Sequence, residues 1–88
     1  MRYRPAPATH FASMRDETGV VLDLGQRQYL HLNGSGALLW SVLENGASLE
    51  ELAEALRERY GIEQSVAHQD AECWIDEMLA RGAAVVDE

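Results

Sequence analysis

The sequence has 88 residues, 47% of them hydrophobic and 25% charged, which is typical of one folded domain. Its 15 acidic and 7 basic side chains give a formal net charge of -8, which disfavours nucleic acid or an anionic membrane as a partner because like charges repel. No apolar run reaches the roughly 18 residues of a membrane span. Arg2, Arg4 and the prolines near them are unlike a secretory signal, and Cys73 has no cysteine to pair with, so we expect a cytoplasmic protein.

The N-terminal residues 1–9 contain two prolines and show no periodicity. We expect them to form a flexible arm or a loosely docked strand, ahead of a single domain that spans residues 10–88. Residues 10–15 alternate weakly between polar and apolar and predict a first strand. Residues 16–19 then predict a turn.

Two further strands are predicted after that turn. Residues 20–24 are an apolar run rich in β-branched side chains, and Gly25 is placed to take the positive φ that a short hairpin needs. Residues 27–32 alternate polar with large apolar side chains, which is the period of a half-buried strand. Together the three segments predict an antiparallel meander.

Helical spacing begins directly after the meander. Asn33 is a favourable cap for a helix over residues 35–44. Ser48 and Glu51 form a capping-box pattern, which predicts that a second helix begins at residue 49. A glycine at position 61 predicts the end of that helix at residue 60.

The last helix is predicted over residues 70–81, behind a connector at residues 62–68 whose form the sequence leaves open. One face of this helix is apolar, and Gly82 ends it. Residues 83–86 form a short apolar tail. The apolar face consists of Ala71, Trp74, Ile75, Met78 and Leu79.

The predicted order is therefore βββααα, an α+β domain that suits a winged-helix-like topology with a three-stranded antiparallel sheet followed by three helices. That topology is common in DNA-binding regulators, but fold alone does not define function. The second and third helices would meet the phosphates with an acidic surface, which disfavours this use. Their acidic residues are Glu50, Glu51, Glu54, Glu58, Asp70, Glu72, Asp76 and Glu77.

The sequence offers little for catalysis or for cofactor binding. His10, His31 and His68 have no metal-ligand spacing, and Cys73 has no basic neighbour that would favour its thiolate. The glycines of residues 34–36 fit a helix start better than a phosphate-binding loop. We therefore expect no catalytic residue, no metal and no cofactor.

Binding through exposed backbone remains as a function. Residues 27–32 form the last strand of the meander, so one side of that strand is free to pair with a guest strand, unless the N-terminal arm or a dimer partner shields it. The third helix would then form the wall of a groove beside that edge. A proline at Gln28 or Leu30 would remove a donor to the guest if either N–H faces outward.

The order and spacing of these elements resemble the PqqD-like family of RiPP recognition elements, which bind the leader peptides of ribosomally made, modified peptides. The resemblance covers residues 20–82 and is nearest to the stand-alone leader-binding B proteins of lasso-peptide biosynthesis. Gly25 lies earlier than usual for the family, and Ala71 stands where a larger aliphatic residue is usual. The matching residues are Leu22, Asp23, Tyr29, Leu32, Asn33, Gly36 and Trp40.

This resemblance implies that a leader peptide adds as an antiparallel strand to residues 27–32, against the third helix. It also implies a separate cysteine-type leader peptidase and an ATP-dependent cyclase as partners, with no catalysis by this chain. A PqqD-type peptide chaperone for a radical-SAM enzyme and a winged-helix DNA-binding regulator are the alternatives. The predicted peptide-binding residues are Arg27, Gln28, Tyr29, Leu30, His31, Leu32, Asp70, Cys73, Trp74 and Glu77.

Overall fold

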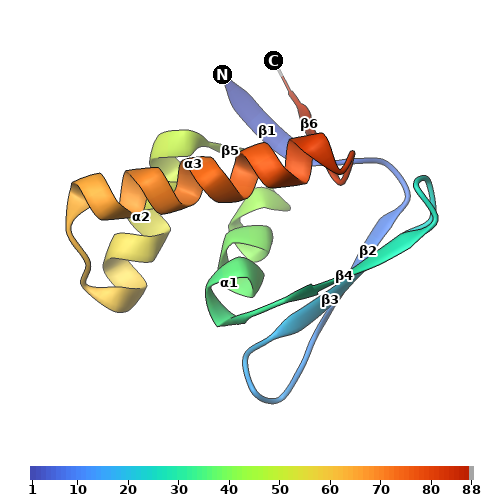
Figure 1. The fold of residues 1–88 in the computed structure, drawn as a ribbon, viewed down its shortest axis with the longest axis horizontal. Coiled ribbons are helices and arrows are strands. Elements are labelled where there is room, and N and C mark those ends of the chain that lie inside the picture. Colours follow the sequence, from blue (N-terminus) through green and yellow to red (C-terminus); the bar gives the residue numbers. More distant parts are fainter. Residues whose placement is uncertain (88) are drawn as a thin grey trace.

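The computed structural model describes residues 1–87, which form a small α+β fold with two three-stranded antiparallel sheets and three helices (Figure 1). In chain order the elements are β1 (Arg2–Pro5), β2 (Thr9–Ser13), β3 (Gly19–Asp23), β4 (Gln28–Leu32), α1 (Gly34–Leu43), β5 (Ala47–Ser48), α2 (Leu49–Tyr60), α3 (Gln64–Ala80) and β6 (Ala84–Val86).

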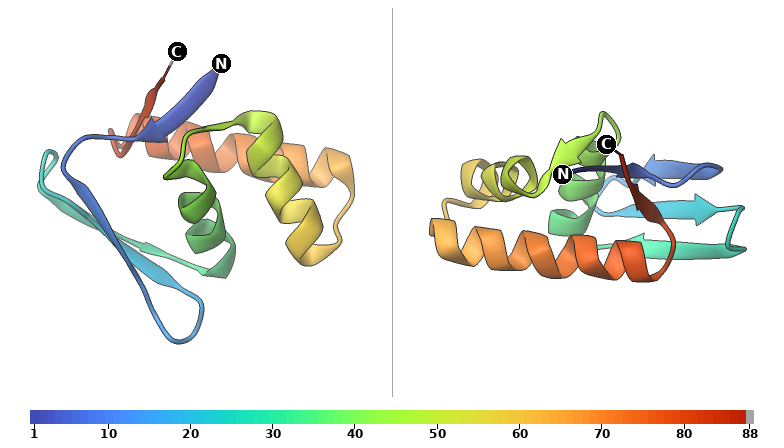
Figure 2. Two further views of the ribbon diagram at one scale, coloured as in Figure 1. Left: turned by 180° about the vertical axis from the view of Figure 1, so that it is seen from behind. Right: turned by 90° about the horizontal axis from the view of Figure 1, so that it is seen from above.

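The predicted meander is the sheet β2-β3-β4, which we call the wing sheet because it projects away from the helices (Figures 1 and 2). Val21 of β3 lies between Phe11 of β2 and Leu30 of β4 in the ladder. Val21 and Leu30 are buried, whereas Leu22 is exposed, so one face of the wing sheet packs on the core and the other is open.

The second sheet has the order β5-β1-β6 and contains strands that the sequence did not predict as a sheet. Residues 2–5, for which a mobile arm or a docked strand was expected, form its central strand β1. Hydrogen bonds from Ala6 N to Ala83 O (2.8 Å) and from Asp87 N to Arg2 O (2.7 Å) flank the β1–β6 pair. These strands have only two to four residues and pair with segments that are distant in sequence. Such short segments show no recognisable alternation of polar and apolar residues, so the sequence did not predict the sheet.

The caps of α1 and α2 are those that the sequence predicted. The Asn33 side chain accepts a hydrogen bond from Gly36 N, and the capping box of Ser48 and Glu51 is complete. Gly61 adopts a left-handed conformation (φ 65°) and ends α2. Each interaction satisfies backbone groups that the end of a helix leaves unpaired.

The prediction for the third helix was wrong at its N-terminus, because α3 begins at Gln64 rather than at residue 70. In the part of the chain that the structure describes, no side chain caps the first turn of α3, and Val66 in that turn is exposed, so no amphipathic pattern marks the start. The buried residues there are alanines, Ala67 and Ala71, which allow α3 to pack closely on α2.

The core lies where α1, α2 and α3 meet the inner face of the wing sheet, with α3 lying across the other two helices (Figure 2). Its largest fully buried apolar side chains are Trp40, Leu43, Leu52, Ile75 and Val21. Among residues 1–87, no helix combines the length and the apolar character needed to cross a membrane.

Candidate functional site

β4 is an edge strand. Among residues 1–87, no strand pairs with the side of β4 that faces away from β3. The N-terminal segment, which could have covered this edge, pairs with β5 and β6 instead. The edge therefore presents main-chain donors and acceptors, and the N-terminal arm does not shield it, which was one of the alternatives that the sequence left open.

The hydrogen bonds on the far side of β3 show which way its backbone groups point. Leu24 N donates to Ala8 O (3.0 Å), and at the opposite end of β3 Met14 N donates to Thr18 O (2.8 Å). Because successive residues of a strand direct their N–H and C=O groups to opposite sides, the even-numbered residues of β3 face β2. Its odd-numbered residues, including Val21, therefore face β4.

This alternation fixes the outward groups of β4. Gln28, Leu30 and Leu32 lie opposite odd-numbered residues of β3, so their N–H and C=O groups pair within the sheet. The N–H and C=O groups of Tyr29 and His31 then face the open edge. The sequence left open whether Gln28 or Leu30 pointed outward, and the ladder shows that neither does.

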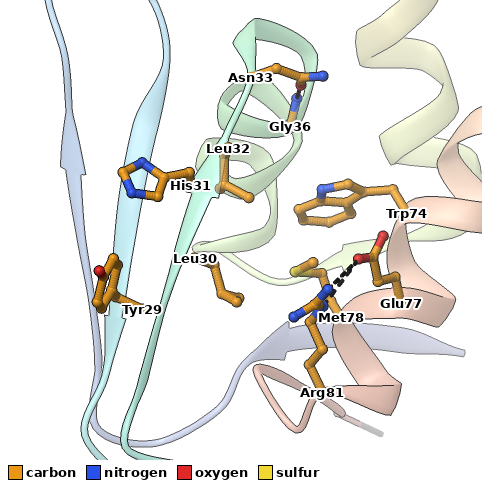
Figure 3. A pocket seen from close by; sticks show the side chains of 10 residues that line it. All are labelled: Tyr29, Leu30, His31, Leu32, Asn33, Gly36, Trp74, Glu77, Met78 and Arg81. Carbon is orange, nitrogen blue, oxygen red and sulfur yellow. Dashed lines mark hydrogen bonds and ion pairs between the residues drawn. The ribbon is translucent and has the colours of Figure 1, made fainter.

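The side chains of β4 divide in the same alternating way. Figure 3 shows Leu30 and Leu32 directed toward α3, and Tyr29 and His31 directed away from it. The two leucines are buried, while the Tyr29 side chain is exposed and contacts the His31 ring edge to face, with 5.6 Å between ring centroids. Tyr29 and His31 therefore contribute backbone groups to the open edge, and Leu30 and Leu32 contribute apolar side chains to the groove.

The opposite wall of the groove is the C-terminal half of α3 (Figure 3). Trp74 packs edge to face on the core residue Trp40, with centroids 6.4 Å apart, and its buried indole N–H has no hydrogen-bond partner within residues 1–87. Glu77 and Arg81 form an ion pair of 3.0 Å at the rim. The groove has a volume of about 310 Å³ and is lined by Tyr29, Leu30, His31, Leu32, Asn33, Gly36, Trp74, Glu77, Met78 and Arg81.

One end of the groove is held by three groups that we call the clasp: the Asp23 carboxylate, the Gln28 side chain and the Arg81 carbonyl. Gln28 Nε2 donates to Asp23 Oδ2 (3.1 Å) and to Arg81 O (2.9 Å). Asp23 Oδ1 also accepts from Gln26 N (3.1 Å), and Asp23 is only 1% exposed. The clasp ties the β3–β4 hairpin to the end of α3.

The hairpin itself differs from the prediction at one residue. Arg27, and not Gly25, adopts the positive φ (55°), while the Asp23 carboxylate holds the turn from inside. β4 therefore begins at Gln28, and Arg27 lies in the turn rather than in the strand. Asp23 closes this loop without needing a left-handed glycine at Gly25.

A second hollow of about 730 Å³ adjoins the groove beyond Trp74. Asp70 and Cys73 line this hollow rather than the groove beside β4. Its other lining residues are Asn33, Gly34, Ser35, Leu39, Leu56, Tyr60, Ile62, Trp74 and Glu77. Because Asn33, Trp74 and Glu77 line both spaces, an occupant of the groove can extend a side chain into the hollow.

The structure therefore brings six of the ten predicted residues to the groove and distributes the others around it. Gln28 belongs to the clasp, Arg27 to the turn, and Asp70 and Cys73 to the hollow. The other four lining residues, Asn33, Gly36, Met78 and Arg81, were not among the ten. The sequence placed Met78 on the apolar face of the last helix and Asn33 and Gly36 among the residues that match the family, and Arg81 lies four residues after Glu77, with which it pairs along the helix.

The ionisable groups with shifted pKa values lie elsewhere. Hydrogen bonds from Thr18 lower the pKa of Asp16, and the Ser48 backbone N–H followed by Arg2 lowers the pKa of Glu51. Neither carboxyl lines the groove. Within residues 1–87, no group of three or more histidine, cysteine or acidic side chains is placed to hold a metal ion.

The geometry defines a class of protein: a small domain with an open edge strand that faces a helix across a groove. Residues 18–83 match the family described as Coenzyme PQQ synthesis protein D (PqqD), and the chain belongs to this family. The PqqD-like resemblance predicted from the sequence is thereby confirmed. No curated protein sequence matches the chain.

Two solved structures share the fold. One, described as TbiB1 in complex with the TbiA(beta) leader peptide, has a TM-score of 0.84 and 23% identity, covering 96% of this chain and 99% of that chain. The other, described as lasso peptide synthetase B1 complexed with the leader peptide, has a TM-score of 0.80 and 27% identity, covering 96% and 98%. The match extends over nearly the full length of all three chains.

Proposed function

We propose that this protein binds the leader peptide of a ribosomally made precursor, as the recognition component of a lasso-peptide pathway. The observation that carries the proposal is the open edge of β4, whose free backbone groups at Tyr29 and His31 border the groove against α3. Both similar structures are described as complexes with a leader peptide, which supports the same use of this fold.

In this proposal the leader adds to β4 as an antiparallel strand. Tyr29 and His31 each donate a hydrogen bond to the guest backbone through the N–H and accept one through the C=O. These hydrogen bonds supply affinity that does not depend on the guest's side chains. Guest residues opposite Leu30 and Leu32 direct their side chains into the groove, toward Trp74. Selectivity then comes from these alternate side chains, with Asp70 and Cys73 lining the adjoining hollow.

Trp74 is the proposed anchor of the groove wall. Aromatic side chains in partly dry pockets often carry about 2 kcal/mol or more of binding energy. Glu77 lies at the rim beside Arg81, where charges mainly affect the rate of association. Gln28 and Arg27 flank the guest at the clasp end of the groove.

The chain acts without catalysis of its own, and the chemistry belongs to its partners. These are a cysteine-type leader peptidase, which removes the leader, and an ATP-dependent cyclase, which closes the ring. The thiol of Cys73 is exposed in the hollow, and the His31 ring is directed away from the groove, so the two are not arranged as a nucleophile and its base. The proposed location of this assembly is the cytoplasm.

One alternative uses the same groove for another pathway. The name of the matched family favours a peptide chaperone that presents its precursor to a radical-SAM enzyme in quinone-cofactor synthesis. A winged-helix DNA-binding regulator is the less favoured alternative, because the surfaces of α2 and α3 are acidic. Binding of duplex DNA with a steep salt dependence would favour the regulator.

Isothermal titration calorimetry with the leader encoded beside this chain's gene tests the proposal, and a proline scan tests the edge. His31→Pro removes an outward N–H without breaking the wing sheet and should weaken leader binding about tenfold. Ser13→Pro is the matched control, since the same alternation directs its N–H away from β3 at the opposite edge. Equal leader affinity in the two folded variants would show that β4 is not the binding edge.

A further inference from the structure

The two ends of the groove beside β4 differ, because β4 and the C-terminal half of α3 run along it in opposite directions (Figure 3). Leu32, at the end of β4, lies at the same end of the groove as Trp74. The start of β4 lies at the other end, where Gln28 is hydrogen-bonded to the Arg81 carbonyl. A guest strand antiparallel to β4 therefore enters at the Trp74 end, beside the hollow, and leaves at the clasp.

The Trp74 end of the groove is acidic. Asp70 and Glu77 line the hollow there, and among residues 1–87 no basic side chain lines it. Asp70 is exposed and forms no ion pair within the described part of the chain. Glu77 pairs with Arg81, which lies one turn further along α3 and lines only the groove. The N-terminal residues of an antiparallel guest therefore lie beside carboxylates.

The clasp end of the groove is basic. Within residues 1–87, Arg15 and Arg27 are the two arginines that form no ion pair, and Arg27 lies in the exposed turn directly before β4. Arg81 lies at the same end, on α3. The Asp23 carboxylate is also here, but it is buried and both of its oxygens accept hydrogen bonds, so it is not free to bind a cation of the guest. The C-terminal residues of an antiparallel guest therefore pass arginine side chains.

We propose that these charges determine the direction in which a guest binds and the kind of leader that the groove accepts. The preferred leader carries basic residues before the strand that pairs with β4 and acidic residues after it, beside Asp70 and Arg27 respectively. This inference rests on the proposed function. A guest in the opposite direction would place like charges together at both ends of the groove, which disfavours it.

The acidic residues after the paired strand distinguish this proposal from simple attraction between net charges. A chain with a formal net charge of -8 attracts any basic peptide and repels acidic residues wherever they lie in it. Only a local positive charge makes acidic residues favourable at one end of the guest. Because Asp70 and Arg27 are exposed, their charges act mainly on the rate of association and are screened by salt.

The test combines two charge reversals with three peptides. The peptides are the synthetic leader encoded beside this chain's gene and two versions of it, in which glutamine replaces the charged residues either before or after the paired strand. Hydrogen exchange of the bound leader identifies that strand.

The variants are Arg27→Glu and Asp70→Lys. Their controls, Arg15→Glu in the β2–β3 turn and Glu72→Lys, make the same changes of net charge at exposed residues that line neither the groove nor the hollow. Biolayer interferometry measures association rates at low and high salt, and circular dichroism verifies folding.

At low salt Arg27→Glu should slow binding of the intact leader about fivefold, but not that of the version without charges after the strand. Asp70→Lys should slow the intact leader similarly, but not the version without charges before the strand. Both effects should fade at about 0.5 M salt, and neither control should slow binding more than about twofold.

Equal effects of Arg27→Glu and Arg15→Glu, or responses exchanged between the two glutamine versions, would overturn the inference while leader binding itself stands. An encoded leader with acidic residues before the paired strand and basic residues after it would also overturn the inference. Failure of the wild-type chain to bind the intact leader would instead overturn the proposed function.

Discussion

Removal of the Gln28 side chain should loosen the hairpin from α3 and destabilise the whole domain. Gln28→Ala deletes two hydrogen bonds, one to the nearly buried Asp23 carboxylate and one to the Arg81 carbonyl. A hydrogen bond to a charged group contributes about 1.5–3 kcal/mol and one to a neutral group about 0.5–1.5 kcal/mol. Because Gln28 is partly exposed and water replaces part of this bonding, we expect a loss of about 2 kcal/mol.

Urea denaturation followed by circular dichroism measures this loss, and Gln26→Ala is the matched control. The Gln26 side chain lies close to Gly82, and its backbone N–H keeps its bond to Asp23 after the substitution. The control should stay within about 0.5 kcal/mol of the wild type. Equal stability of the two alanine variants would refute the clasp as a structural tie.

Gln28→Glu tests the same contact independently, through the dependence of stability on pH. It places a second carboxylate beside Asp23 in the folded state, where two negative charges repel. At neutral pH this variant should be less stable than Gln28→Ala, and protonation of the introduced carboxyl at acidic pH should restore stability. A pH profile parallel to that of the wild type would argue against direct contact between the two side chains.

Three further outcomes follow from other contacts. Trp74→Ala should reduce leader affinity by about 2 kcal/mol, roughly 30-fold by calorimetry, with circular dichroism to verify folding. Glu77→Lys should slow association modestly in stopped-flow mixing, and the effect should fade as salt rises. The Ser48 backbone N–H and Arg2 hold the pKa of Glu51 below its ordinary value of 4.5, so its contribution to stability is present above that pH and is lost as the pH falls through the folded-state pKa. Glu51→Gln should therefore flatten the acid limb of a thermal-melting profile, and an unchanged limb would contradict this assignment.

The parts of the fold that were predictable from sequence are those with local causes. α2 begins and ends where Ser48, Glu51 and Gly61 indicated, because capping depends on residues within one turn. The alternation in β4 was visible because a strand with one buried face has a period of two. The PqqD-like resemblance combined several such local features in one order.

The parts that were not predictable depend on contacts distant in sequence. β1 finds its partners at β5 and β6, more than 40 residues away, and no local pattern of Arg2–Pro5 reveals them. The outward direction of Tyr29 and His31 follows from the register with β3, which the turn at Arg27 sets. The clasp likewise joins residues 23, 28 and 81, so it emerges only in the folded chain.

β4 directs the backbone groups of Tyr29 and His31 to the open edge and their side chains away from α3, so different substitutions test the backbone and the side chain separately. Alanine at His31 removes a side chain that is directed away from α3 but keeps the N–H and C=O of the binding edge. Proline at the same position removes the edge donor as well. If the backbone of the edge binds the leader, His31→Ala should change leader affinity less than about twofold, whereas His31→Pro should weaken it about tenfold. Equal effects of the two substitutions on leader affinity would mean that the His31 side chain, and not its backbone, contacts the guest.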